Sequence, residues 1–267
     1  MFGVVCAAIV GWYLFIAETA ADNDFIGGIG DLLSGFAELP ELAFDGSGYS
    51  NFWTFMADNE GFGEILRTTV DHAQLVLASM LWAVVIAIGL GILVNRVRAL
   101  SGFVIGVSSI MLTIPSLAAF AILISVSFIG IGDRGPIIAL TAYSVMPILR
   151  NTITGLDGVD RAVVESAKGM GLSPFQRLVR VEMPLAWPVI LTGIRIATLL
   201  NVGIAAIAVL VGGSGLGSYI NDGLTRYPNP GSVERMWVGV LWTIALALVF
   251  DLLFGILRKL TTPKGLR

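Results

Sequence analysis

Two charged residues, Arg195 and Asp251, interrupt long apolar runs and are the first candidates for chemistry in this sequence. If those runs are helices that cross a membrane, each residue lies roughly 10 Å inside the same end, counted at about 1.5 Å per residue. A charge at membrane depth is costly unless it is paired or wetted, and such residues often mark functional sites. We therefore expect an intramembrane charge pair; the alternative is that Arg195 snorkels to the interface.

The remaining chemistry-bearing residues do not form a recognisable enzyme site. Cys6 is the single cysteine and His72 the single histidine, so the chain cannot build a disulfide framework or a Cys/His zinc cluster. We expect His72 to lie at the membrane interface rather than to serve as a ligand or proton relay. The glycine-rich run GGSGLG at 212–217 lacks the lysine of a phosphate-binding P-loop. The sequence therefore predicts no catalytic residue, no metal site and no cofactor held by this chain.

The composition indicates a membrane protein. The 267 residues are 56% hydrophobic and 13% charged, whereas a soluble domain carries about 25% charged residues. The net charge is −3, and the basic patch that a nucleic-acid binder would show is missing from the sequence. A lipid bilayer is therefore the expected surrounding, and nucleic acid is not an expected partner.

Six apolar runs meet or approach the length of about 20 residues that a helix needs to cross a bilayer. They are 1–17, 73–94, 103–129, 137–149, 188–211 and 236–257. The fourth is short, so we expect it to continue helically past Arg150 or to lie buried among its neighbours. Pro115 and Pro147 are expected to kink the third and fourth spans. The predicted fold is an all-α, polytopic transmembrane helical bundle of about six spans.

The distribution of basic residues predicts the orientation. With both termini inside, eleven of the 16 Lys and Arg residues lie inside, four lie outside and Arg195 lies within the fifth span. This N-in/C-in arrangement satisfies the positive-inside rule. The chain then divides into an N-terminal span with an acidic extracytoplasmic segment (1–72), a transmembrane domain (73–258) and a cytoplasmic tail (259–267).

The inner loop at 150–186 begins with a predicted short helix. Asp160 can cap a helix over 161–170, because its side chain can accept a hydrogen bond from the first turn. Gly171 can end that helix by adopting the left-handed backbone conformation that other residues avoid. The sequence thus predicts a short helix followed by a sharp turn.

A second short helix is predicted over 175–181. Ser173 followed by Pro174 is a favourable N-cap and first-turn pair. Pro184 and Pro188 are expected to end this helix and to lead into the fifth span, because proline lacks an N–H and disfavours helix at the preceding residue. Together the two helices would form a compact pair on the inner surface.

The same loop resembles a motif of ABC importer permeases, written EAA---G---------I-LP. Here it reads Glu165, Ser166 and Ala167, then Gly171, then Val181, Glu182, Met183 and Pro184. Ser166 replaces the second-position alanine, Val181 the isoleucine and Met183 the leucine, and the spacing is intact. In that family the loop is the coupling-helix element that seats in a groove of the cytoplasmic ATPase.

The resemblance covers roughly 68–223 and points to one branch of the family. Four stretches carry it: TIPSLAAFAILI at 113–124, IALTAYSVMPILRNT at 138–152, GIRIA at 193–197 and GGSGLGSYI at 212–220. They are similar to the osmoprotectant permeases, which import quaternary amines such as glycine betaine, carnitine and choline. The branch also includes permeases for other betaine-like compounds such as ergothioneine.

The resemblance implies a set of partners in a bacterial cytoplasmic membrane. They are two ABC ATPase subunits that bind ATP and Mg²⁺, an extracytoplasmic substrate-binding protein, and a second permease, either another copy or a paralogous chain. Residues expected to contact or shape the ATPase interface are Glu165, Ser166, Ala167, Gly171, Pro174, Val181 and Pro184. They would act through shape, with Glu165 fixing the first helix by a hydrogen bond.

Gly212, Gly213, Gly215 and Gly217 have two possible roles. They form either a flexible turn at the end of the fifth span or, as the resemblance implies, part of the outer gate. Two other readings of the whole chain remain open. One is an ABC permease for an amino acid or another small polar nutrient. The other is an ion-driven secondary transporter, although Asp251 is the single carboxylate within the predicted spans.

Overall fold

The computed structural model describes residues 61–127, 129–229 and 231–261, which are built from helices without any strand. The chain divides between Asn59 and Glu60 into two compact units, and the description here concerns the second. The predicted first span at 1–17 and most of the acidic segment lie outside the described residues.

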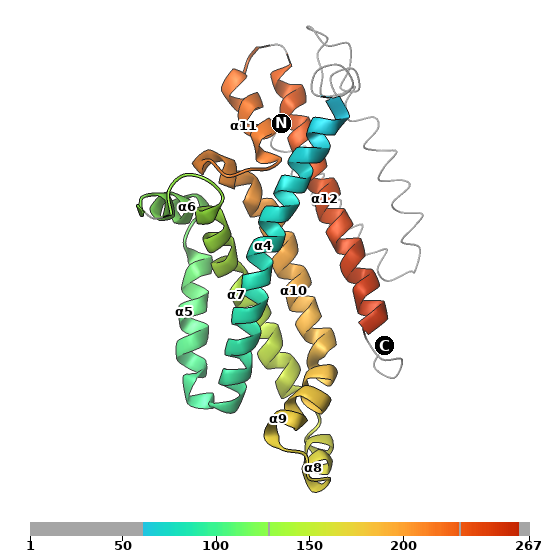
Figure 1. The fold of residues 1–267 in the computed structure, drawn as a ribbon. Helices are drawn as coiled ribbons and strands as arrows, with labels where there is room; N and C mark the ends of the chain where they lie inside the picture. Colours follow the sequence, from blue (N-terminus) through green and yellow to red (C-terminus); the bar gives the residue numbers. More distant parts are fainter. Residues whose placement is uncertain (1–60, 128, 230, 262–267) are drawn as a thin grey trace. The chain divides into compact units, whose positions relative to one another are not determined.

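Nine α-helices and three short 3-10 or π segments make up the described part of the chain (Figure 1). In order they are α4 (Gly61–Arg96), α5 (Ser101–Thr113), α6 (Ser116–Ile124), α7 (Arg134–Asp157), α8 (Arg161–Gly169), α9 (Pro174–Arg177), α10 (Met183–Ala205), α11 (Gly217–Arg226) and α12 (Ser232–Thr261), with the short 3-10 helix η1 (Arg98–Leu100) after α4. A π-helical turn, η2 (Leu178–Glu182), joins α9 to α10, and the 3-10 helix η3 (Ala206–Val211) extends α10.

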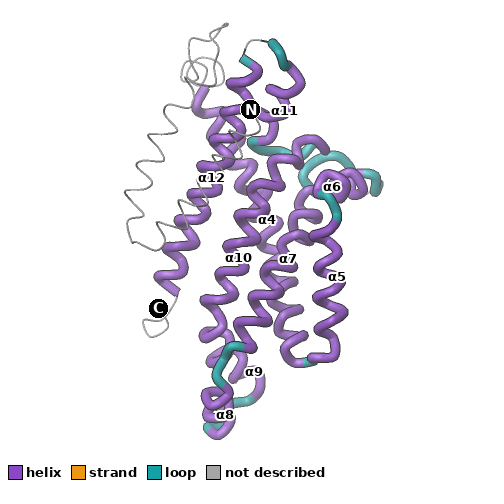
Figure 2. The backbone as a smooth tube through the Cα atoms, turned by 180° about the vertical axis from the view of Figure 1, so that it is seen from behind, coloured by secondary structure: helices purple, strands orange, loops and turns teal. Residues whose placement is uncertain are grey.

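Three of the nine α-helices form the centre of the bundle. Helices α4, α7 and α10 pack side by side in both views (Figures 1 and 2). Close approach between them depends on small residues, as it does in helix packing within membranes. The closest approaches put Gly91 against Thr152, Gly193 against Asn151, and Gly155 against Ala186.

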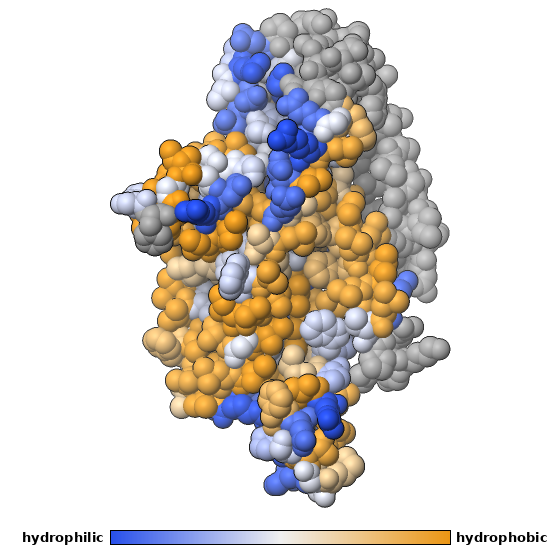
Figure 3. Space-filling model, viewed as in Figure 1, coloured by the Kyte–Doolittle hydropathy of each residue, from blue (hydrophilic) through white to orange (hydrophobic). Residues whose placement is uncertain are grey.

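Three helical segments are long and apolar enough to cross a membrane, namely Phe62–Arg96, Pro174–Val211 and Ser232–Thr261. Helices α5 and α6 pass the same test as a pair, so the described residues hold three such segments, or four if the bent pair is one span. On the face drawn in Figure 3, a broad apolar surface lies between hydrophilic residues at the two ends. The helical, multi-pass architecture is as predicted, and the count of six spans stays a prediction.

The predicted third span is broken. Helices α5 and α6 meet at Pro115 with a bend of 94°, which is far more than the kink expected from a proline. Ile114 has an extended backbone, as the residue before a proline prefers. The hydroxyl of Tyr143 donates a 2.6 Å hydrogen bond to the carbonyl oxygen of Ile114, so α7 holds the break in place.

The predicted fourth span continues past Arg150, since α7 runs through Pro147 to Asp157. One other boundary was wrong. Pro184 and Pro188 do not end the second helix of the inner loop, because α9, the π-turn and α10 form one continuous helical segment. Helix α4 begins at Gly61, within the predicted outer segment.

Candidate functional site

The first helix of the inner loop, called here the coupling loop (150–186), has the predicted ends. The Asp160 side chain accepts a 2.8 Å hydrogen bond from the Ala162 N–H, which caps α8. At the other end Gly171 has a φ of 81°, in the left-handed region. Its N–H donates to the Lys168 carbonyl and the Leu172 N–H donates to the Ala167 carbonyl. This pair of bonds is a Schellman motif, which closes the helix and reverses the chain.

The second helix starts at a capping box and continues into the membrane domain. The Ser173 hydroxyl accepts from the Gln176 N–H at 3.3 Å, and the Gln176 side chain accepts from the Ser173 N–H at 2.9 Å. Further on, the Met183 N–H donates to Leu178, five residues back. Pro184 can donate no such bond, and as the second residue of α10 it needs none. The π-turn thus carries the helix past the proline that was expected to stop it.

The motif residues have different surroundings. Ala167 is buried, with 1% of its surface exposed, and faces the second helix of the loop. Glu165 is exposed and makes a 3.6 Å ion pair with Lys168, in place of the helix-fixing hydrogen bond that we expected. The Ser166 hydroxyl donates to the Ala162 carbonyl at 2.8 Å. Pro174 and Pro184 are exposed and Val181 is half-buried.

Large apolar side chains are exposed on the coupling loop. Four large side chains project from it into the open: Val163 (41% exposed), Met170 (73%), Phe175 (74%) and Val179 (50%). We call these four residues the apolar crown. The loop lies at the end of the bundle opposite α11 (Figure 1), so the crown is a ready contact surface for another protein.

Sequence reasoning missed Glu182, which joins the coupling loop to α4. Its side chain is 6% exposed. One carboxylate oxygen accepts a 2.8 Å bond from Arg96, the last residue of α4, and the other lies 3.6 Å from Nε of Arg177. The sequence did offer one signal for this pairing, because Glu182 is a single acidic residue in a stretch of basic and apolar residues. A more exposed tie beside it joins Asp157 at the end of α7 to Asn95 and Arg98.

The glycine loop (212–217) follows α10 and is held by its neighbours. The Ser214 N–H and hydroxyl both contact the carboxylate of Asp133, at 2.7 and 3.0 Å. Gly212 has a φ of 81° and Gly215 a φ of 128°, which other residues rarely adopt. A Cβ on Gly213 would press on the Ala208 carbonyl and one on Gly217 would overlap the Ala206 carbonyl. The loop is therefore a closely packed turn.

His72 is fully buried, on α4 against α10 and the glycine loop. The Leu216 N–H donates to its Nδ1 at 3.2 Å. Nδ1 is then an acceptor, so the proton sits on Nε2, which donates to the Val202 carbonyl at 3.0 Å. The sequence offered no signal for this role, because both partners are backbone groups from distant segments.

Arg195 and Asp251 lie together. Nε and Nη2 of Arg195 donate to the two carboxylate oxygens of Asp251 at 2.6 and 2.8 Å. This bidentate geometry is the strongest form of the pairing. It joins α10 to α12, and the two side chains are 40% and 24% exposed in the single chain.

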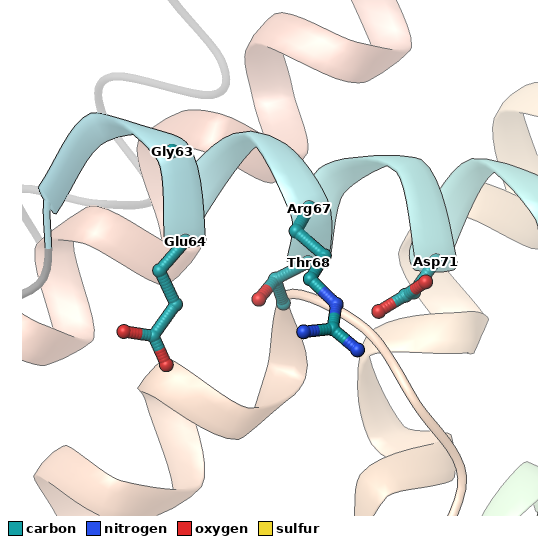
Figure 4. A pocket seen from close by; sticks show the side chains of 5 residues that line it. All are labelled: Gly63, Glu64, Arg67, Thr68 and Asp71. Carbon is teal, nitrogen blue, oxygen red and sulfur yellow. The ribbon is translucent and has the colours of Figure 1, made fainter.

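A hollow of about 520 Å³ opens beside the first turns of α4 and is lined by Gly63, Glu64, Arg67, Thr68 and Asp71. Figure 4 shows the Glu64, Arg67 and Thr68 side chains extending from one side of that helix. The described residues contain no group of three or more His, Cys, Asp or Glu side chains that could hold a metal ion. The hollow therefore offers mixed charges but no built ligand site.

Comparison with known proteins agrees with this arrangement. The chain is 39% identical over 205 residues to the choline transport system permease protein OpuBB of Bacillus subtilis, covering 77% of this chain and 92% of that protein. It is 38% identical to the osmoprotectant import permease protein OsmW of Salmonella typhimurium, covering 80% and 98%. The glycine betaine/carnitine/choline permease protein OpuCB of Bacillus subtilis is 38% identical, with 80% and 95% covered.

Among solved structures, the fold is similar to an inward-facing form of the MetNI methionine ABC transporter. The TM-score is 0.65 at 21% identity, covering 74% of this chain and 96% of that chain. Residues 83–262 match the family described as the binding-protein-dependent transport system inner membrane component. The coupling loop lies inside that match, and so do the polar contacts described above except those of His72. The chain belongs to this family of membrane permeases.

Proposed function

We propose that this chain is the transmembrane permease subunit of an ATP-driven importer for osmoprotectants, that is, quaternary amines such as glycine betaine, carnitine and choline. It works with ABC ATPase subunits, which bind ATP and Mg²⁺, and with an extracytoplasmic substrate-binding protein. A second permease, identical or paralogous, completes the pathway. The substrate class is supported by relatives that are about 38% identical over most of the chain.

The observation that carries this proposal is the coupling loop with its apolar crown. Phe175 and Met170 are almost three-quarters exposed on a rigid pair of capped helices. Large exposed apolar side chains with a polar surround are typical of protein–protein contacts. Because the loop continues directly into α10, a displacement of its docked partner would move the membrane helices.

In this mechanism the permease does no chemistry on ATP. ATP binding draws the two ATPase subunits together, and the coupling loop passes that displacement to the bundle. Nucleotide can shift the two access states only by interacting differently with them. The chain's own residues supply shape and stiffness: Gly171 makes the turn, and the glycine loop closes the far end of the bundle.

The proposal includes a topology. Six spans with both termini inside the bacterial cytoplasmic membrane would place the coupling loop, with its ATPase, in the cytoplasm. The glycine loop and α11 would then face the substrate-binding protein. The Lys and Arg distribution supports this orientation.

Uptake in proteoliposomes tests the function. The vesicles hold this chain, its ATPase, any second permease encoded beside it and the substrate-binding protein, and uptake of labelled glycine betaine is measured with and without internal ATP. We expect uptake only with ATP and competition by unlabelled carnitine and choline. Gly171→Asp should abolish uptake, because an acidic side chain at a φ of 81° distorts the turn beside the ATPase.

Two results would revise the proposal in different ways. ATP-dependent uptake of an amino acid in place of quaternary amines would keep the mechanism and refute the substrate class. Uptake driven by an ion gradient without the ATPase would refute the importer mechanism itself.

A further inference from the structure

Helix α4 is tied to the α10 segment at three levels along its length. At the coupling-loop end, Arg96 binds Glu182. Nearer the middle, the Asn201 side chain donates to the Ser79 hydroxyl at 3.2 Å. At the far end, His72 bonds both Val202 and Leu216.

Most of the residues that make these contacts are buried, which makes the contacts costly to break. Glu182, Asn201, Ser79 and His72 all have 5% or less of their surface exposed. Loss of Arg96 would leave the buried Glu182 carboxylate with only its longer, 3.6 Å contact to Arg177. Loss of the His72 imidazole would remove a hydrogen bond from the Val202 carbonyl and one from the Leu216 N–H. Arg96 has 39% of its side chain exposed, but each of the three contacts, called joints here, has at least one buried partner.

The outer joints are also far apart. His72 and Arg96 belong to one uninterrupted helix, with about 36 Å between them at 1.5 Å of rise per residue. The coupling loop is bonded to one end of this helix and the glycine loop to the other. Helix α10 runs from the coupling loop to the glycine loop along the chain itself, so α4 and α10 form a frame that is closed at both ends.

From this geometry we propose that α4 is a strut that makes the glycine loop follow the coupling loop, and that Glu182, Arg96 and His72 are positioning residues for transport. Without the joints, α10 would connect the two loops through the π-turn at one end and the 3-10 segment at the other, and α7 would reach the glycine loop only through the exposed contact of Asp133 with Ser214. The π-turn and the 3-10 segment are both departures from regular α-helix and would bend under load. The inference rests on the proposed function, since it concerns how ATP use is converted into movement of the far end.

The test compares transport with ATP hydrolysis in the same proteoliposomes of the whole complex. Glu182→Gln keeps the shape of the side chain but removes the charge that Arg96 binds. We expect the amount of solute imported per ATP hydrolysed to fall about fivefold or more, while substrate-stimulated hydrolysis changes by less than about twofold. The matched control is Asp157→Asn, the same change in the exposed tie at the same end of α4, which should leave the ratio within about twofold.

Two further variants separate positioning from mere stability. Arg96→Gln breaks the same joint from the α4 side but leaves Glu182 paired with Arg177, and it should lower the ratio in the same direction as Glu182→Gln. His72→Leu removes both the donor to Val202 and the acceptor for the Leu216 N–H. It should lower the same ratio and speed hydrogen exchange at the Leu216 amide.

Hydrogen exchange of the unmodified complex, with and without ATP analogue, keeps the proposal testable if a variant fails to assemble. Nucleotide should change protection together in the coupling loop, at 212–216 and around His72. A change in hydrogen-exchange protection at 212–216 without one around His72 would contradict the role of α4 as a strut. An unchanged import-to-hydrolysis ratio in Glu182→Gln would contradict it as well. Absence of ATP-dependent uptake by the unmodified complex would count against the proposed function instead.

Discussion

The coupling loop and the glycine loop lie at opposite ends of the same helices and keep their shapes by different means. The coupling loop is shaped mainly by contacts within a few residues, such as the Asp160 cap and the Schellman turn at Gly171. The glycine loop is shaped by distant partners, Asp133 and His72. A locally determined element can keep its form while it is pushed. A loop held by neighbours moves when those neighbours move.

The largest effect is expected at Gly217, where close packing against a neighbouring backbone requires a glycine. In Gly217→Ala the new Cβ would overlap the Ala206 carbonyl oxygen, and backbone cannot give way cheaply. We expect a loss of about 3 kcal/mol or more in stability, measured as the unfolding midpoint of the chain in detergent.

Gly171→Ala is the matched comparison at the other end. Nothing lies within 4 Å of its Cβ position, so its cost is the left-handed backbone alone, about 1–2 kcal/mol. If Gly171→Ala were the more damaging of the two, the distinction between a packed glycine loop and a locally determined coupling loop would be lost.

Next in size is the ion pair between α10 and α12. Asp251→Asn removes the bidentate acceptor of Arg195, and we expect a loss of about 2 kcal/mol, as for hydrogen bonds to charged groups. The same carboxylate-to-amide change in Glu165→Gln breaks an exposed pair 3.6 Å long and should cost about 0.3 kcal/mol. Unfolding midpoints in detergent measure both losses of stability. Equal shifts of the midpoint would show that the Arg195–Asp251 pair is no stronger than the exposed Glu165–Lys168 pair.

The last comparison is between two serines. Ser173→Ala removes a helix cap and Ser214→Ala removes a hydroxyl bonded to Asp133, each worth about 1 kcal/mol. Hydrogen exchange should show faster exchange near α9 alone for Ser173→Ala. For Ser214→Ala it should show faster exchange across 212–217. Changes that spread to the opposite loop in either variant would contradict this separation.

The same contrast explains which features could be predicted from the sequence. The caps at Asp160 and Ser173 and the turn at Gly171 depend on short-range geometry, so residue types at fixed spacing were enough. Arg195 and Asp251 were found through their shared depth. The bond partners of Glu182 and His72 come from distant segments, and no spacing rule reports them.

Two proline positions show where local rules fail. Pro184 was expected to end a helix, but a π-turn precedes it and the helical segment continues through it. Pro115 was expected to kink a span, but it turns the chain by 94° because Tyr143 from another helix secures the freed carbonyl. In both cases the surroundings decide how far a proline bends the chain.

Docking of the ATPase on the coupling loop tests the central claim most directly. We would measure how much ATPase copurifies with the chain carrying Phe175→Glu, against Leu224→Glu on α11 as a control of similar exposure (74% and 61%) at the opposite end. The account predicts that Phe175→Glu lowers copurified ATPase about tenfold or more, while Leu224→Glu leaves it near the unmodified level. Full retention of the ATPase by Phe175→Glu, or equal loss in both variants, would contradict it.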